Sequence, residues 1–257
     1  MNDPWSGLKR FTPARIALGR AGGSLPTSAL LAFQLAHAQA RDAVQRDLDV
    51  ASLAGQVAPL GLEILQLDTV ASDRRTFIQY PDRGRMLSDA SKAVLESRSS
   101  DRRGHDAAFI LADGLSAAAI ERHARSLLET MLTQLGPTGW RIAPLCIVRQ
   151  ARVAIGDEIG ALLGAAMSVV LIGERPGLSS PDSLGAYLTW NPRAGRTNAE
   201  RNCISNIRPE GLDYATAAHK LAYLMRESRR RKLSGVDLKE TAPALAPAPL
   251  SSVLPEN

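Results

Sequence analysis

Apolar stretches and helical stripes alternate along the second half of the chain. Residues 107–112, 142–148 and 169–172 are almost continuously apolar, which is typical of strands buried on both faces of a sheet. The apolar positions of 184–190 are less regular, and we expect a fourth strand there. Helical segments separate the first three strands, and this order predicts an α/β fold with a parallel sheet and right-handed crossover connections.

The helices expected between these strands begin and end at recognisable residues. Ser116 is placed to cap the longest of them, which Gly136-Pro137 ends. Its apolar positions recur at three- and four-residue spacing, at Ile120, Ala124, Leu127, Leu128, Met131 and Leu135. A short helix is expected over 159–163, and a final helix over 214–231.

The first hundred residues have a less regular pattern, in which helices predominate. Thr27 is expected to cap a helix with one apolar stripe. That stripe consists of Leu30, Phe33, His37, Ala40 and Val44. Asp82 is expected to cap a second helix, which includes 86–95. Residues 73–80 favour a short strand, whereas 58–67 do not decide between strand and helix.

Polar and proline-rich segments divide the chain. The run 97–104 is polar and without periodicity, so we place a domain boundary there. Residues 1–100 are then a mainly helical N-terminal region, and 101–235 form the sheet domain. Residues 241–257 are rich in Ala and Pro, and we expect 236–257 to be a disordered tail.

The composition is that of a soluble globular protein. Of the 257 residues, 45% are hydrophobic and 22% are charged, and no apolar run is long enough to cross a membrane. Residues 1–11 lack the apolar core of a signal peptide. The two cysteines, Cys146 and Cys203, are too few for a disulfide framework. We therefore expect a cytoplasmic protein without membrane contact.

The net charge of +5 raises the question of a nucleic-acid partner. Part of the excess lies in 226–232, at the end of the final predicted helix. Aromatic residues make up only 4% of the chain, which does not favour a base-stacking surface. A basic run of this kind is more typical of a solvated helix end or a subunit contact, so we expect no nucleic-acid binding. A nucleic-acid-binding module is kept as a rival interpretation.

Side chains that follow the strands are the candidate binding residues. Asp113 follows the first strand, 149–153 follow the second, and 173–177 follow the third. Because the carboxyl ends of parallel strands share one edge of a sheet, these residues predict a crevice for a sizeable ligand. The last of these segments, with the sequence G-E-R-P-G, is also compatible with an ordinary tight turn.

No catalytic or metal-binding constellation is evident. Gly114-Leu115-Ser116 lacks the G-x-S-x-G pattern of a hydrolase nucleophile, and the histidines and cysteines lack zinc-type spacing. Cys203 is a candidate reactive thiol, although such a cysteine is more often a packing residue. The glycine-rich run 19–24 lacks the G-x-G-x-x-G spacing. A self-sufficient α/β nucleotide-binding enzyme is one alternative function for this chain. Such an enzyme would need a phosphate loop, which this sequence lacks.

A set of short motifs lies in a fixed order along residues 15–235. Its members are Gly19-Arg20-Ala21-Gly22, Thr27, Leu30-Leu31, Phe33, His37, Asp42, Pro81-Asp82, Gly84-Arg85, Asp113-Gly114-Leu115-Ser116, Arg152-Val153, Asp157, Ile159-Gly160, Gly173-Glu174-Arg175-Pro176-Gly177-Leu178 and Cys203-Ile204-Ser205-Asn206-Ile207. With these motifs the sequence resembles the small (light) subunit of ethanolamine ammonia-lyase, an adenosylcobalamin-dependent enzyme. The region before Arg15 is shorter than in that family, and the Ala/Pro-rich tail is unfamiliar.

The resemblance implies a function within a larger assembly. The complete enzyme converts ethanolamine to acetaldehyde and ammonia, and homolysis of the coenzyme's cobalt–carbon bond starts its radical chemistry. The large subunit, a barrel, carries the substrate site, and the small subunit supplies a Rossmann-like wall against adenosylcobalamin. The resemblance thus implies a carbon–nitrogen lyase in a hetero-oligomer. It also implies a cytoplasmic location, with a bacterial microcompartment as an alternative.

Three residues match the coenzyme contacts of that family: Val153, Glu174 and Cys203. Val153 can offer its backbone and an apolar contact, and Glu174 can accept hydrogen bonds from corrin amide groups. Cys203 can pack closely or form a weak hydrogen bond. None of the three is expected to be a catalyst. The chain lacks the Asp-x-His-x-x-Gly segment that supplies a cobalt ligand in other cobalamin proteins. We therefore expect cobalt to keep its own dimethylbenzimidazole ligand.

Overall fold

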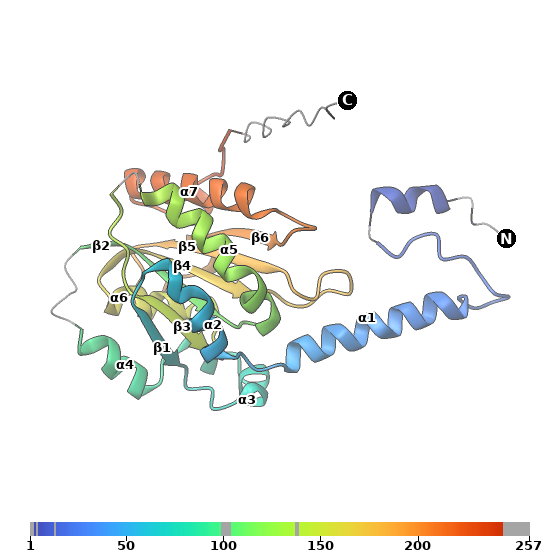
Figure 1. Cartoon of the computed structure of the whole chain (residues 1–257), viewed down its shortest axis with the longest axis horizontal. Helices are drawn as coiled ribbons and strands as arrows, with labels where there is room; N and C mark the ends of the chain where they lie inside the picture. The colour runs from blue at the N-terminus through green and yellow to red at the C-terminus, as the bar shows by residue number, and fades with distance from the viewer. Residues whose placement is uncertain (1–2, 4, 13, 99–103, 137–138, 244–257) are drawn as a thin grey trace, which may run out of the picture.

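A six-stranded mixed sheet forms the centre of the molecule (Figure 1). The computed structural model describes the chain except for residues 1–2, 4, 13, 99–103, 137–138 and 244–257. The strands are β1 (Ile64–Asp68), β2 (His105–Ala112), β3 (Leu145–Arg149), β4 (Ala165–Gly173), β5 (Leu184–Trp190) and β6 (Arg201–Ile207). Their order in the sheet is β1-β3-β2-β4-β5-β6. The first four strands in this order are parallel, which agrees with the predicted α/β class.

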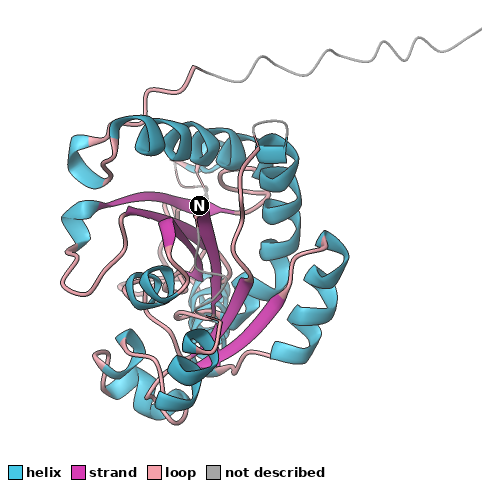
Figure 2. Cartoon of the chain, turned by 90° about the vertical axis from the view of Figure 1, so that its left-hand side faces the viewer, coloured by secondary structure: helices cyan, strands magenta, loops and turns pink. Residues whose placement is uncertain are grey.

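Helices cover both faces of the sheet (Figure 2). They are α1 (Thr27–Gln45), α2 (Val50–Val57), α3 (Arg74–Gln79), α4 (Asp89–Glu96), α5 (Ala117–Leu135), α6 (Ile155–Leu162) and α7 (Tyr214–Arg231). Helices α2, α5 and α7 pack on one face, and α4 and α6 pack on the other. Two separate hydrophobic cores therefore lie on the two sides of the sheet.

Strand β2 shows why the sheet is buried on both faces. Phe109 and Leu111 point into the core beside α5, whereas Ile110 and Ala112 point into the core beside α6. Because side chains alternate along a strand, a strand buried on both faces must be apolar at every position. The continuous apolar run in the sequence is explained by this central place in the sheet.

The prediction of a parallel sheet is wrong for β5, and β6 was not predicted. Strand β5 runs antiparallel to β4, and β6 runs antiparallel to β5. Only the loop 174–183, without a helix, joins β4 to β5. A parallel neighbour would require a longer crossover connection, usually through a helix. The short loop therefore returns the chain in the opposite direction.

Several local predictions differ from the structure. Residues 73–80 were expected to form a strand, but Asp73 caps helix α3 by accepting from the Thr76 N–H. The prediction that Asp82 caps a helix is also wrong, because Ser88 caps α4. Residues 201–207, for which the sequence predicted no strand or helix, form β6. The undecided segment 58–67 contains most of β1, which pairs with β3.

Helix α1 extends away from the body of the molecule (Figure 1). Pro26, not the expected Thr27, occupies its N-cap position, and no side chain caps it. Its far end is fastened to the body, where Arg74 Nε donates to Val44 O at 2.7 Å and Arg46 pairs with Glu121 of α5. The short 3-10 helix Ser6–Phe11 precedes α1 and has no buried residue.

The expected N-terminal region, sheet domain and tail are in contact with one another in the structure. Strand β1 lies within residues 1–100 and belongs to the same sheet as the strands of 101–235. Of the segment expected to be a disordered tail, the first residues contact the body: Leu238 is buried, and Tyr223 of α7 bonds to Thr241 at 2.7 Å. Residues 244–257 lie outside the described residues. None of the described helices is long and apolar enough to span a membrane.

Candidate functional site

The carboxyl ends of β2 and β4 lie side by side, where the strand order reverses. From β2 the chain passes through α5 to β3 on one side, and then through α6 to β4 on the other. In α/β sheets, ligands bind beyond the strand ends at such a reversal. A Cβ on Gly114, whose φ is +53°, would lie 2.2 Å from the Gly173 carbonyl oxygen. The loops after the two strands therefore meet backbone to backbone, and this contact requires glycine.

Asp113 fastens the neighbouring loops beneath this point. Its buried carboxylate accepts hydrogen bonds from the backbone N–H groups of Gln150 and Ala151, both at 3.0 Å. Arg74 Nη1 pairs with the same carboxylate at 3.2 Å. Burial raises the pKa of Asp113, while Arg74 and the N–H groups favour the charged form and oppose that rise. Asp113 is fully enclosed, so it positions the turn after β3 and does not face a ligand.

Two of the three predicted coenzyme contacts line one cleft at this edge of the sheet. Val153 lies in the turn before α6, and Glu174 directly follows β4; both are half-buried. The cleft has a volume of about 420 Å³. Its other lining residues are Gly114, Leu115, Arg152, Ile172, Gly173, Arg175 and Tyr187. The loops after β2, β3 and β4 therefore meet at one cleft, as predicted, although Asp113 is buried beneath the cleft and does not line it. We refer to this space as the strand-end cleft.

Glu174 also joins the ends of β4 and β6. Its carboxylate accepts a short hydrogen bond from the Ser205 hydroxyl and a second, at 3.1 Å, from the Asn206 N–H. Its own backbone N–H donates to Ser183 O at 3.0 Å. A carboxylate offers about four acceptor positions. Glu174 thus holds β6 in place and keeps acceptor positions for a further donor.

Cys203 lies beside the strand-end cleft and is not among the residues that line it. It is exposed on β6, directly opposite Tyr187 of β5, which does line the cleft. Partial burial of its thiol raises the pKa of Cys203, the Tyr187 hydroxyl lowers it, and the charge of Glu174 raises it further. The net rise favours the neutral thiol, so the structure does not support an activated thiolate.

Tyr187 is a residue of this cleft that the sequence did not single out. It packs on the edge of the core beside α6, at the place where helices no longer cover the sheet. Burial, aided by Cys203 and Glu174, raises the pKa of Tyr187, so its hydroxyl stays protonated. The irregular apolar pattern of β5 gave no sign of this role. The antiparallel pairing with β4 sets its position, since Tyr187 lies opposite Val170.

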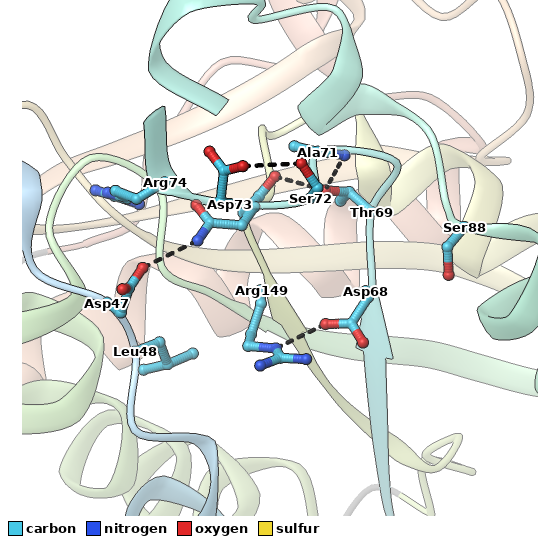
Figure 3. Close-up of a pocket in the computed structure, with 11 residues that line it drawn as sticks. Asp47, Leu48, Asp68, Thr69, Ala71, Ser72, Asp73, Arg74, Ser88 and Arg149 are labelled. Carbon is cyan, nitrogen blue, oxygen red and sulfur yellow. Dashed lines mark hydrogen bonds and ion pairs between the residues drawn. The ribbon is translucent and has the colours of Figure 1, made fainter. Parts of the chain in front are cut away.

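A second cavity, of about 490 Å³, lies at the ends of β1 and β3 (Figure 3). Asp68 and Arg149 pair across it at 2.7 Å, and Gln150 Nε2 donates to Asp47 at 3.1 Å. Thr69 Oγ1 donates to the Gln150 carbonyl oxygen at 2.9 Å. Most of the polar groups here are paired with one another. We interpret this network as structural, because it fastens the loop after β1 to the turn after β3.

His123 and the basic run are held by contacts away from the strand-end cleft. His123 Nδ1 lies 2.7 Å from the Tyr214 hydroxyl. In the basic run, Arg229 pairs with Asp106 at 3.2 Å, and Arg230 pairs with Glu227 at 2.6 Å. Within the part of the chain that the structure describes, no group of three or more His, Cys, Asp or Glu side chains could hold a metal ion.

Comparison with known proteins identifies the family. Residues 2–239 match the family described as "Ethanolamine ammonia-lyase light chain (EutC)". A protein of Azotobacter vinelandii named ethanolamine ammonia-lyase small subunit is 58% identical over 241 residues, which cover 93% of this chain and 89% of that protein. A protein of the same name from Xanthomonas campestris pv. campestris is 54% identical over 258 residues, which cover 99% of this chain and 95% of that protein. The chain therefore belongs to the ethanolamine ammonia-lyase light chain family.

Proposed function

We propose that this chain, as the small subunit of an ethanolamine ammonia-lyase, forms one wall of an adenosylcobalamin site that the large subunit completes. The observation that carries the proposal is the strand-end cleft, where Val153 and Glu174 meet beside Tyr187. Because the chain belongs to this family, it is a subunit of a lyase. The reaction that we propose for the assembled enzyme converts ethanolamine to acetaldehyde and ammonia. When bound, adenosylcobalamin supplies a radical by homolysis of its cobalt–carbon bond.

The side chains of the strand-end cleft fit the edge of a corrin ring. Corrinoids carry many amide groups, which both donate and accept hydrogen bonds. Glu174 provides an acceptor at one side, and Arg152 provides a buried Nε that has no hydrogen-bond partner in the described residues. Buried donors are rarely left unpaired, so this atom indicates a missing acceptor. Val153 and Tyr187 add apolar surface between these polar groups.

In this proposal the chain binds and orients the coenzyme without acting as an acid or a base. Glu174 uses its remaining acceptor positions for amide donors, and Val153 packs against the ring. Cys203 contacts the same ligand from β6, where the uncovered side of β5 and β6 continues the wall. The strands β3-β2-β4, joined through α5 and α6, support a Rossmann-like description of this part of the chain.

The partner surface proposed for the large subunit includes α1. Leucines Leu31 and Leu35 are 58% and 61% exposed and lie on the side opposite the stripe that contains Phe33. A helix that is apolar on opposite sides is normally buried. In the described part of the chain, Ala36 is the one buried residue of α1. The name light chain implies a heavier partner. We therefore assign the covering of the exposed side of α1, which carries Leu31 and Leu35, to the large subunit.

Substitution of Glu174 tests the coenzyme contact. Glu174→Ala removes a charged acceptor, and such hydrogen bonds contribute about 1.5–3 kcal/mol. We therefore expect binding of adenosylcobalamin to the assembled complex to weaken about ten- to a hundredfold. Turnover at saturating coenzyme should fall much less. A coenzyme titration gives both the apparent dissociation constant and the plateau rate.

Ser205→Ala is the matched control. It tests the alternative that Glu174 braces β6 and does not contact the coenzyme. Ser205 donates to the same carboxylate, so its loss removes one of the two hydrogen bonds that brace β6 and leaves the acceptor. We expect Ser205→Ala to change the dissociation constant little, and Cys203→Ser to weaken binding mildly. Equal losses for Glu174→Ala and Ser205→Ala would contradict direct binding. Deamination of ethanolamine by the purified chain alone would contradict the shared site.

A further inference from the structure

Four arginines surround a second cleft that adjoins the strand-end cleft. Arg41 comes from α1, Arg85 from the 3-10 turn before α4, and Arg152 and Arg175 from the loops after β3 and β4. The volume of this space, which we call the arginine cleft, is about 600 Å³. Leu115, Arg152 and Arg175 line both clefts, so the two clefts adjoin.

These four positive charges have almost no compensation. No Asp or Glu is among the described residues that line the arginine cleft. The side chains of Arg85 and Arg175 make no hydrogen bond or ion pair with any described residue, and Arg41 has only its neighbour Asp42, at 3.6 Å. Elsewhere in the molecule, by contrast, the buried Arg201 is paired with a carboxylate at 2.6 Å.

Arg152 is the most constrained of the four. Its guanidinium lies 4.2 Å from the centre of the Phe77 ring and makes one long hydrogen bond, 3.4 Å, to the Phe77 carbonyl oxygen. Its Nε is buried without an acceptor. Burial lowers the pKa of Arg152, and the charges of Arg74, Arg85 and Arg175 act in the same direction. An anion in the cleft would relieve both the repulsion and the missing hydrogen bond.

A phosphate group is the anion that this arrangement suits. Guanidinium groups present a planar fork of donors that matches two phosphate oxygens. Apolar residues of α1 and of the loop before α4 complete the walls, as expected for a ligand that carries carbon rings beside its charge. Arg175 directly follows Glu174, so one ligand that has both amides and an anion can reach both residues.

We propose that the arginine cleft binds the phosphodiester of the coenzyme's nucleotide loop, with Arg85 and Arg175 as its principal donors. The inference rests on the proposed function, because adenosylcobalamin is the ligand assigned to the adjoining strand-end cleft. In an adenosylcobalamin molecule the phosphodiester is the one formal anion outside the corrin ring. The nucleotide loop also extends from the ring edge, as binding across two adjoining clefts requires.

The test compares three corrinoids on the complex assembled with the large subunit. Adenosylcobalamin has the phosphodiester, adenosylcobinamide phosphate has a phosphate without the base, and adenosylcobinamide has neither. For Arg85→Gln and Arg175→Gln we expect adenosylcobalamin binding to weaken about tenfold or more, as loss of a charged hydrogen bond does. Adenosylcobinamide phosphate should weaken similarly, and adenosylcobinamide by less than about twofold, since it has no phosphate to lose. Equilibrium dialysis measures these constants without turnover.

Matched variants separate the anion site from other effects. Arg175→Lys keeps the charge and should restore part of the affinity for the two phosphate-containing corrinoids. Arg226→Gln removes an exposed arginine of α7 and should change no constant. Equal weakening of all three corrinoids by Arg85→Gln and Arg175→Gln would overturn the proposal. Loss of large-subunit assembly in these variants would also overturn it, because the cleft would then bind an acidic protein segment.

The same titrations distinguish this inference from the proposed function. If Glu174→Ala leaves every corrinoid constant unchanged, the strand-end cleft is not the coenzyme site and the proposed function fails. If Glu174→Ala weakens all three corrinoids while the arginine variants show no selectivity, only the phosphate site fails. Unchanged adenosylcobalamin binding in the double variant Arg85→Gln/Arg175→Gln would likewise exclude the phosphate site alone.

Discussion

Helices α1 and α5 have the same length and very different surroundings. Both span 19 residues and both carry apolar positions at helical spacing. Helix α5 buries ten residues between the sheet, α2 and α7, whereas α1 buries only Ala36 within the described structure. Figure 1 shows α5 inside the layered body and α1 reaching out from it. An apolar stripe thus predicts that a helix will be covered, but it does not say which chain covers it.

Substitution of one leucine in each helix should show most clearly how differently α5 and α1 contribute to stability. Leu127 in α5 is fully buried and Leu31 in α1 is 58% exposed. Truncation of a buried leucine leaves a cavity, so Leu127→Ala should lower the free energy of unfolding by about 2–5 kcal/mol. Leu31→Ala should change it by less than about 0.5 kcal/mol, as is usual for surface positions. Urea denaturation of the isolated chain measures both values, and similar losses would show that α1 packs on its own body.

The same helix should behave differently once the large subunit is present. Leu31→Glu or Leu35→Glu should weaken assembly with the large subunit about ten- to a hundredfold, because burial of a leucine contributes about 1.5–3 kcal/mol. The stability of the isolated chain should remain unchanged. Gln34→Glu adds the same charge at a polar position of α1 and is the control. Concentration-dependent assembly can be measured by light scattering, and equal effects of all three variants would indicate a charge effect only.

The sequence predicted elements best where burial is symmetrical. The central parallel strands and α5 are mostly apolar at their buried positions, with His123 and Ser168 as buried polar exceptions, and Ser116 caps α5 as expected. Strand β6 was missed because its sequence, R-N-C-I-S-N-I, places only Ile204 and Ile207 in the α7 core, and these are three positions apart. This spacing does not match the two-residue period of a strand, and the polar residues between them are typical of a loop. The orientation of β5 depends on the length of the preceding connection, which periodicity does not report.

The candidate site was predictable only where it follows strand ends. Val153 and Glu174 come directly after parallel strands, so the rule that such ends meet brought them together. Arg41 and Arg85 come from a helix and a turn of the first hundred residues, and nothing in the local sequence relates them to Arg175. Their convergence depends on how the N-terminal region packs against the sheet, which is a long-range property of the fold.

The stability of the folded chain should depend on pH through His123, a buried histidine of α5. Burial lowers the pKa of His123, against the opposing charge of Asp182. A lowered pKa in the folded state means that the unfolded chain binds the proton first as the pH falls through about 6.5. The free energy of unfolding should therefore decrease below that pH, by at most about 1.4 kcal/mol per unit from one proton. His123→Gln should flatten this dependence. The measurement is a set of unfolding curves between about pH 5 and 8, the range in which histidine titrates.

The smallest expected effect concerns how the two helices begin. Ser116 caps α5 by accepting from the Ala119 N–H, whereas Pro26 gives α1 no side-chain cap. Pro26→Ser would supply a hydroxyl for the Ala29 N–H, and a cap of this kind stabilises a helix by about 0.5–1 kcal/mol. Loss of proline also loosens the unfolded chain, so the proper reference is Pro26→Ala.

Relative to Pro26→Ala, we expect Pro26→Ser to slow amide hydrogen exchange in the first turn of α1 about two- to fivefold. Global unfolding should stay the same, because α1 opens independently of the sheet when few contacts join them. A parallel rise in global stability would mean that α1 and the body unfold as one unit. That result would remove the contrast with α5, and the exposed leucines of α1 would then need an explanation within this chain.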